Sequence, residues 1–255
     1  MEETIHGTTM PVLEISLQPG ESVISEAGEF SWMSDAVQFS TGTGGGMGGK
    51  GIMGAVKRAV AGASVFMTTY TAEGGPGSIA FASKVPGHIL PIDVAPGNEF
   101  MVHRHGFMAA TPGIQLAMGF QQSLRGGIFG GEGLILQRIS GEGKAWIDLQ
   151  GEVIVYDLQP GQTMRVHPGH AGLFQASVTF TVQRVQGMAN RYMGKDGHHF
   201  AVLTGPGRIW LQSMPTPILA GVIYENLPHG DRDDHGIADA GAAVGGAKII
   251  GDLLR

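Results

Sequence analysis

Apolar and polar residues alternate along several short stretches of the chain. Residues 178–183 read Val-Thr-Phe-Thr-Val-Gln, and the same alternation places Val153 and Val155 on one face, opposite Glu152. Residues 64–71 follow it more loosely. A period of two is typical of a half-buried strand, and Gly or Pro turns separate such stretches at short intervals. The pattern predicts an all-β protein, an antiparallel β-sandwich or barrel.

The turn signals themselves repeat along the chain. A Pro-Gly pair occurs at residues 19–20, 96–97 and 160–161, and a Gly-x-Gly motif followed by an apolar run occurs at 75–77, 141–143 and 205–207. Ordinary turn punctuation explains one such motif, but two motifs kept in step three times indicate an internal repeat. We therefore expect three repeats, at about residues 12–83, 88–150 and 152–212, related by a pseudo-three-fold axis.

Short helical inserts and a C-terminal helix are expected beside the strands. The first repeat is longer because of a glycine-rich insertion at residues 41–53, which a loop accommodates at small entropic cost. Residues 52–61 and 114–124 are each predicted to form a short amphipathic helix between glycines. After a polar stretch, apolar residues return at helical spacing between 240 and 254. The sequence thus predicts a β domain at 1–227, followed by a polar linker and helix at 228–255.

Composition excludes several classes of function. The formal net charge is −6 and the 16 Lys and Arg residues are scattered, so nucleic acid is not an expected partner. The chain has no cysteine, which excludes disulfides, a thiolate nucleophile and Cys-ligated zinc. Its first residues lack the pattern of a signal peptide, and we find no apolar run long enough to cross a membrane. A cytoplasmic location is the expectation.

Four sequence blocks in order resemble one known family. They are the glycine-rich run ending in Lys57-Arg58, the stretch 62–66 (Gly-Ala-Ser-Val-Phe), the block 126–134 and the strand 205–211. From about residue 10 to 227 the chain resembles the altered-inheritance-of-mitochondria 24-like proteins, grouped with the tryptophan-RNA-binding-attenuator-like fold. The resemblance implies a β-sandwich, homo-oligomeric assembly and, for a bacterial-type member, no established biochemical role. It transfers no catalytic residue, and RNA binding does not follow from a shared fold.

A phosphate-binding loop is one alternative for the glycine-rich run. Gly44, Gly49 and Lys50 have the required spacing, but Gly51 stands where Ser or Thr should hold magnesium. Glycine-rich sequence meets this pattern easily, so an insertion or oligomer contact is the preferred interpretation.

The repeat alignment suggests one metal site as a hypothesis. Glu26, His103 and His167 each lie six residues after the glycine of a Pro-Gly pair. If the repeats surround a three-fold axis, these side chains converge into a ligand set suited to Fe(II) or Zn(II). The alternative is a solvent-facing strand face, because the neighbours on that face are Ser22, Glu99, Thr163 and Arg165.

The preferred function is a non-enzymatic, homo-oligomeric scaffold or binding protein without a cofactor. Its contacts with protein partners are expected at the inserts 42–62 and 113–131, and the family resemblance implies a link to membrane or respiratory-complex organisation. The first alternative is a metal- or small-molecule-binding protein using Glu26, His103 and His167. The second is weak contact with a membrane surface through the insert that carries Lys57 and Arg58.

Overall fold

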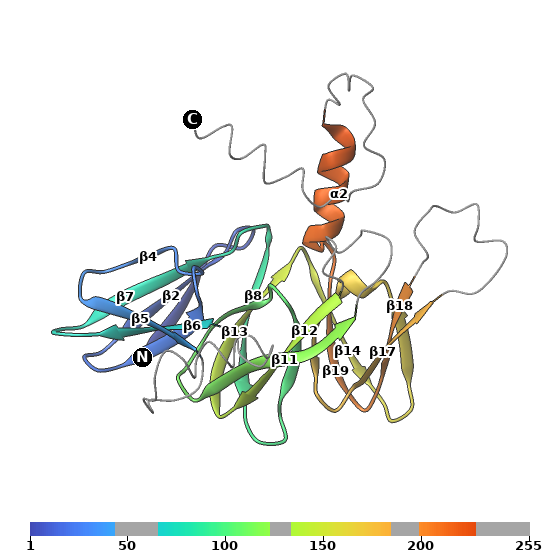
Figure 1. Cartoon of the computed structure of the whole chain (residues 1–255), viewed down its shortest axis with the longest axis horizontal. Coiled ribbons are helices and arrows are strands. Elements are labelled where there is room, and N and C mark those ends of the chain that lie inside the picture. Colours follow the sequence, from blue (N-terminus) through green and yellow to red (C-terminus); the bar gives the residue numbers. More distant parts are fainter. Residues whose placement is uncertain (44–65, 123–133, 185–198, 228–255) are drawn as a thin grey trace.

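The computed structural model of the chain describes residues 1–43, 66–122, 134–184 and 199–227 (Figure 1). The first part contains β1 (Glu2–His6), β2 (Val12–Leu17), β3 (Ser22–Glu26), β4 (Trp32–Met33), β5 (Val37–Thr43), β6 (Phe66–Ala72) and β7 (Gly77–Ala82). The middle part contains β8 (Gly87–Val94), β9 (Phe100–His103), β10 (Phe107–Ala110), β11 (Ile114–Gln122), β12 (Leu134–Gly141) and β13 (Gly143–Gln150). The last part contains β14 (Val153–Leu158), β15 (Thr163–Val166), η1 (Pro168–His170), β16 (Ala171–Gln175), β17 (Thr179–Arg184), β18 (His199–Thr204), β19 (Gly207–Gln212) and α2 (Thr216–Asn226).

The three Pro-Gly pairs form the same turn. The glycines at 20, 97 and 161 have φ values of 86°, 85° and 77°, a left-handed conformation that favours glycine. In each turn the backbone N–H of the residue after the glycine donates to the carbonyl of the residue before the proline, for example Glu21 to Gln18 at 2.9 Å. Proline followed by left-handed glycine is the arrangement of a type II turn. The local sequence therefore fixes how the chain enters β3, β9 and β15.

Four strand pairings occur in each of three consecutive segments, which we call segment one (residues 12–82), segment two (87–150) and segment three (153–212). The opening strand pairs with the closing strand, as β2–β7, β8–β13 and β14–β19. Three further pairings recur in the same way: β3–β6, β9–β12 and β15–β18; β5–β6, β11–β12 and β17–β18; and β4–β7, β10–β13 and β16–β19. All of these pairings are antiparallel.

The strands of the described residues form four sheets that succeed one another along the molecule. Their orders are β1-β2-β7-β4, β5-β6-β3-β10-β13-β8, β11-β12-β9-β16-β19-β14 and β15-β18-β17. A cluster of buried side chains draws on each successive pair of sheets, one around Leu13 and Phe81, one around Val102 and Ile147, and one around Phe174. The described chain is thus a row of sandwiches, with segment one at one end and segment three at the other (Figure 1).

The all-β prediction is confirmed, and period two explains why. In β2, Leu13, Ile15 and Leu17 have no exposed surface, and the residues between them are partly or fully exposed. In β17 the same alternation leaves Phe180 and Val182 partly buried between exposed polar residues. β14 is a strand, as expected, but it does not follow the expected burial pattern, since Val153 is partly buried and Val155 is exposed.

The predicted helix at 114–124 is wrong. Residues 114–122 form β11, which pairs with β12 from Ile114 opposite Gly141 to Gln122 opposite Leu134. Ile114 and Leu116 face the core while Gln115 is exposed, so the stretch follows the period of a strand. Conversely, α2 was not expected inside the β domain. The predicted helices at 52–61 and near 240–254, and the linker that starts at 228, lie outside the described residues.

The structure does not confirm the pseudo-three-fold arrangement. Closure of three segments into a ring by the pairing used between them would require β4 to pair with β15, and both strands instead lie at the ends of their sheets. Among the described residues, no helix is both long and apolar enough to cross a membrane.

Candidate functional site

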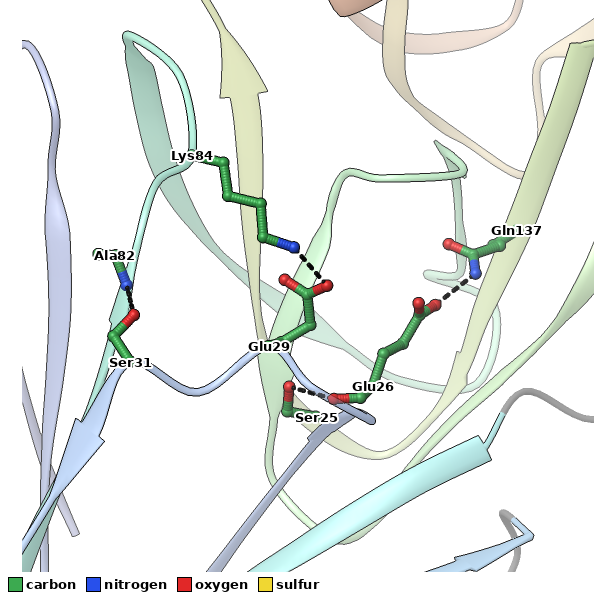
Figure 2. Close-up of polar contacts among 7 residues, drawn as sticks. All are labelled: Ser25, Glu26, Glu29, Ser31, Ala82, Lys84 and Gln137. Carbon is green, nitrogen blue, oxygen red and sulfur yellow. Dashed lines mark hydrogen bonds and ion pairs between the residues drawn. The ribbon is translucent and has the colours of Figure 1, made fainter. Parts of the chain in front are cut away.

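Titratable side chains gather where segment one meets segment two. Glu26 ends β3, Glu29 follows in the loop to β4, and Lys84 comes after β7 (Figure 2). His103 and Asp148 come from β9 and β13 of segment two. The strands β3 and β10 pair across this joint, with Ser25 opposite Ala109 and Ile24 opposite Ala110, which brings the two groups of side chains together. We call these five residues and their hydrogen-bond partners the joint cluster.

Glu26 is held by an amide from the neighbouring segment. The Nε2 atom of Gln137, a buried residue of β12, donates to Oε1 of Glu26 at 2.5 Å (Figure 2). Burial raises the pKa of the Glu26 carboxyl, and the hydrogen bond from Gln137 opposes this effect. The Glu26 carboxyl group is therefore held in a fixed position by a hydrogen bond from segment two.

The loop between β3 and β4 is attached to segment one by an ion pair and a hydrogen bond. Lys84 Nζ lies 2.7 Å from Glu29 Oε1, and the backbone N–H of Ala82 donates to Ser31 Oγ at 2.9 Å (Figure 2). Lys84 is largely exposed, so the ion pair itself adds little stability. Its effect is to place a positive and a negative charge beside the joint.

The protonation of Asp148, a carboxyl group of the joint cluster, is strongly altered by its surroundings. Desolvation raises the pKa of its carboxyl to about 6, and the negative charge of Glu29 adds to the rise. Ser83 Oγ donates to Asp148 Oδ1 at 3.0 Å, and the Lys84 charge also favours the ionised form. Asp148 therefore exchanges its proton close to neutral pH, which is a common property of functional sites.

His103 is shifted in the opposite direction. Desolvation lowers the pKa of its imidazole to about 4, and the nearby His105 contributes in the same sense. Its Nε2 atom is buried and has no hydrogen-bond partner within the described part of the chain. A Cβ atom on Gly106 would lie 2.8 Å from this nitrogen, so the glycine leaves room for the ring. The imidazole is neutral at pH 7.

A small cavity adjoins the joint cluster. It has a volume of about 100 Å³, and its lining includes His103, His105, Gln150 and Gln212. Ligand pockets usually measure about 300–1,000 Å³, so this cavity has room for a few water molecules rather than for a metabolite. Gln150 and Gln212 already bind backbone groups, since Gln150 Oε1 accepts from Thr216 and Gln212 Nε2 donates to Gly169. Gln150 thereby holds the start of α2, and Gln212 is bound to η1.

A larger cleft of about 420 Å³ lies between segments two and three. In it, Arg208 binds Asp157 through two hydrogen bonds of 2.7 and 3.0 Å, and its guanidinium lies 5.9 Å from the ring centre of Trp210. The charge of Arg208 is thus already neutralised by a residue of the same chain. Phe100 packs beside Trp210, with ring centres 6.0 Å apart.

Of the three predicted metal ligands, Glu26 and His103 belong to the joint cluster and His167 does not, and each of the three has different immediate neighbours. Glu26 contacts Gln137, the His103 ring lies beside Gly106, and the His167 ring packs against His170 with centres 5.7 Å apart. Across the four described ranges, no three His, Cys, Asp or Glu side chains form a group that could hold a metal ion. The structure gives the metal site no support, and it stays a hypothesis. The phosphate-loop alternative at 44–51 lies outside the described residues.

Comparison with known proteins identifies one family that matches most of the chain. Residues 3–214 match the family described as mitochondrial biogenesis AIM24. The chain belongs to the AIM24 family. This confirms the family resemblance read from the four sequence blocks. The match covers all three segments and ends before α2.

This AIM24 chain is also similar to two bacterial proteins. An uncharacterised protein of Streptococcus pyogenes serotype M6 is 26% identical over 226 residues, which span 86% of this chain and 87% of that protein. A crystal structure of a Streptococcus pyogenes protein has the same fold, with a TM-score of 0.69 and 24% identity, over 89% of this chain and 99% of that one. The fold of the AIM24 chain is thus shared with an experimentally determined structure, and the serotype M6 relative is itself uncharacterised.

Proposed function

We propose that this AIM24-family chain is a non-enzymatic, self-assembling scaffold or binding protein. The observation that carries the proposal is a group of exposed aromatic side chains at the free end of segment one. Phe30, Trp32 and Phe39 are 38%, 55% and 59% exposed. The rings of Phe30 and Phe39 stack on each other with centres 6.4 Å apart, and both pack on the buried Tyr70. Aromatic residues clustered on a surface are typical of protein interfaces.

The joint cluster supports a structural role over a catalytic one. Its carboxyl groups at positions 26, 29 and 148 are each engaged by a side chain of the same chain, namely Gln137, Lys84 and Ser83. The cavity beside it is too small for a typical substrate. By family resemblance, the partners of such an assembly would lie at membranes or respiratory complexes, and this link belongs to the proposal.

Light scattering of the purified full-length chain tests self-assembly directly. We expect a mass of two or more chains at micromolar concentration. Phe39→Lys adds a charge to the exposed aromatic group and should lower that mass, since Phe39 is mostly in solvent and its replacement leaves the core intact. Ile154→Lys, at an exposed apolar residue of β14 outside the inserts 42–62 and 113–131, is the matched control and should leave the mass unchanged. A wild-type chain that is strictly monomeric would contradict the proposal.

A further inference from the structure

Each end of the described chain carries a free strand edge, and the equivalent strands of the other segments are paired. At one end, β4 is the last strand of the sheet β1-β2-β7-β4. At the other end, β15 is the last strand of the sheet β15-β18-β17. Free strand edges present unsatisfied backbone groups and are sites where another strand can add.

Inside the chain, the strands equivalent to β15 and β4 pair with each other at two places, one between segments one and two and one between segments two and three. β3 of segment one pairs with β10 of segment two, and β9 of segment two pairs with β16 of segment three. Each joint creates a six-stranded sheet, with three strands from one segment and three from the next. The terminal sheets are the two halves of such a sheet: β17-β18-β15 supplies one half, and β4-β7-β2, with β1 added, supplies the other.

The register of these joints is the same in both places. Trp32, Ala109 and Leu173 occupy corresponding positions, because each lies opposite the residue three after the second glycine of a Gly-x-Gly motif. In the first joint Ala109 lies opposite Ser25, and in the second Leu173 lies opposite Val102. Ser25 and Val102 both stand five residues after the Pro-Gly glycine. In segment three that position is Val166.

Burial differs between the joints and the free ends at these same positions. Ala109 and Leu173 are 0% and 1% exposed, whereas Trp32 is 55% exposed. Ser25 and Val102 have no exposed surface, whereas Val166 is partly exposed. Both positions are buried in the two internal joints, whereas the apolar residues that occupy them at the free ends are exposed or partly exposed. This difference indicates that another molecule completes a third joint of the same kind.

We infer that β15 of one copy pairs with β4 of a second copy, antiparallel, with Val166 opposite Trp32 and Arg165 opposite Met33. The inference rests on the proposed self-assembly and specifies its interface. Within one chain these strands cannot meet, because β4 lies at one end of the molecule and β18, the partner of β15, at the other (Figure 1). Since the two surfaces differ, the contact is head-to-tail, and it generates a closed ring or an open filament.

Cysteine cross-linking tests the register, and the natural chain contains no cysteine that would interfere. The full-length double variants Trp32→Cys with Val166→Cys, and Met33→Cys with Arg165→Cys, place two thiols at directly opposed positions. Opposed Cβ atoms in a sheet lie about 4.5–5.5 Å apart, close to the range that a disulfide spans. Two adjacent pairs are used because the spacing alternates along an antiparallel ladder. We expect a ladder of disulfide-linked chains on a non-reducing gel under mild oxidation.

The matched control is Trp32→Cys with Thr163→Cys. Thr163 lies in the same strand but three residues from Val166, about 10 Å away and on the other face, so cross-linking should be roughly tenfold weaker. Each single variant alone should give no linked species, because Trp32 does not face its own copy in a head-to-tail contact. A mixture of the two single variants should give linked dimers and no longer ladder. This mixing test keeps the inference open to refutation even if a double variant folds poorly.

The outcomes separate the inference from the proposed function. A wild-type chain that is monomeric by light scattering contradicts both. A wild-type oligomer in which neither opposed pair cross-links above the Thr163→Cys control contradicts this interface and leaves self-assembly standing. Disulfides formed only within single chains would show closure of one molecule on itself and would also overturn the inference.

Discussion

The indole N–H of Trp146 donates a hydrogen bond of 2.8 Å to a carboxylate oxygen of Glu3, a residue 143 positions away in the sequence. The second oxygen of Glu3 accepts from Lys144 Nζ at 2.9 Å. Trp146 is 1% exposed, so its N–H would lack any partner without Glu3. The N-terminal strand β1 is therefore attached both to β2 by backbone pairing and to β13 by these side chains.

Glu3→Ala should lower the stability of the chain. Loss of the carboxylate leaves a buried N–H unsatisfied, at a cost of about 1–3 kcal/mol. In a chain of this length each kcal/mol lowers Tm by roughly 2–4 °C. Differential scanning calorimetry measures the change, and Glu2→Ala is the control, since Glu2 is exposed on the neighbouring position of the same strand. Equal Tm values for the two variants would show that the contact contributes nothing.

Asp148 should make the folded state less stable as pH rises. Its carboxyl has an ordinary pKa of 3.8 in the unfolded chain and about 6 in the fold. A group whose pKa is raised in the fold contributes stability below its unfolded pKa, and that contribution is lost as pH rises from about 4 to about 6. The loss is on the order of 2–3 kcal/mol. Asp148→Asn keeps an acceptor for Ser83 and removes the ionisation, so the variant should be more stable than wild type at pH 7 in urea unfolding.

His103 should have the opposite effect on the pH dependence of stability, and make the folded state more stable as pH rises through the same range. Its pKa falls from 6.5 in the unfolded chain to about 4 in the fold, so stability is present above pH 6.5 and is lost as pH falls towards 4. Glu26 acts in the sense of Asp148, and His105 in the sense of His103. Wild type should therefore show a shallow pH profile.

Two single variants should separate these opposing effects of pH on stability. Between pH 4 and 6.5, Asp148→Asn should gain stability with rising pH, and His103→Gln should lose it. Urea unfolding at several pH values measures both. A steep wild-type profile, or variants whose profiles run parallel to it, would contradict the assigned shifts.

The sequence predicted the sheets better than it predicted the site. Period two and the Pro-Gly turns are local properties, so strands such as β2 and β17 were foreseeable. Residues 114–122 were misread because glycines bracket a short stretch whose alternation ends at Met118, where the pairing with β12 has an irregularity. β14 was recognised as a strand, but no local pattern shows that its sheet ends there.

The joint cluster depends on contacts between segments, which no local pattern contains. The repeat alignment selected Glu26 and His103, and both lie at the ends of corresponding strands. Gln137 and Asp148 were missed, because the residues at the Asp148 position in the other segments are Ala82 and Gln212. Comparing the three segments for a charged residue that stands alone would have found Asp148. Nothing in the sequence indicates that Gln137 reaches Glu26 across 111 positions.

The Glu26–Gln137 contact should stabilise the joint between segments one and two through its geometry rather than through the charge. Gln137→Leu removes the donor and leaves a partly buried carboxylate without it, which should cost about 1.5–3 kcal/mol. Glu26→Gln keeps an acceptor for Gln137 Nε2 and removes a charge that burial disfavours, so it should be neutral or stabilising at pH 7. Glu26→Leu combined with Gln137→Leu replaces both partners by apolar groups and should recover most of the loss. Chemical unfolding of the three variants at pH 7 gives the comparison. If Glu26→Gln were as destabilising as Gln137→Leu, the negative charge of Glu26 itself would be required, and its attraction to the positive charges of Arg104 and Lys84 would carry the contact.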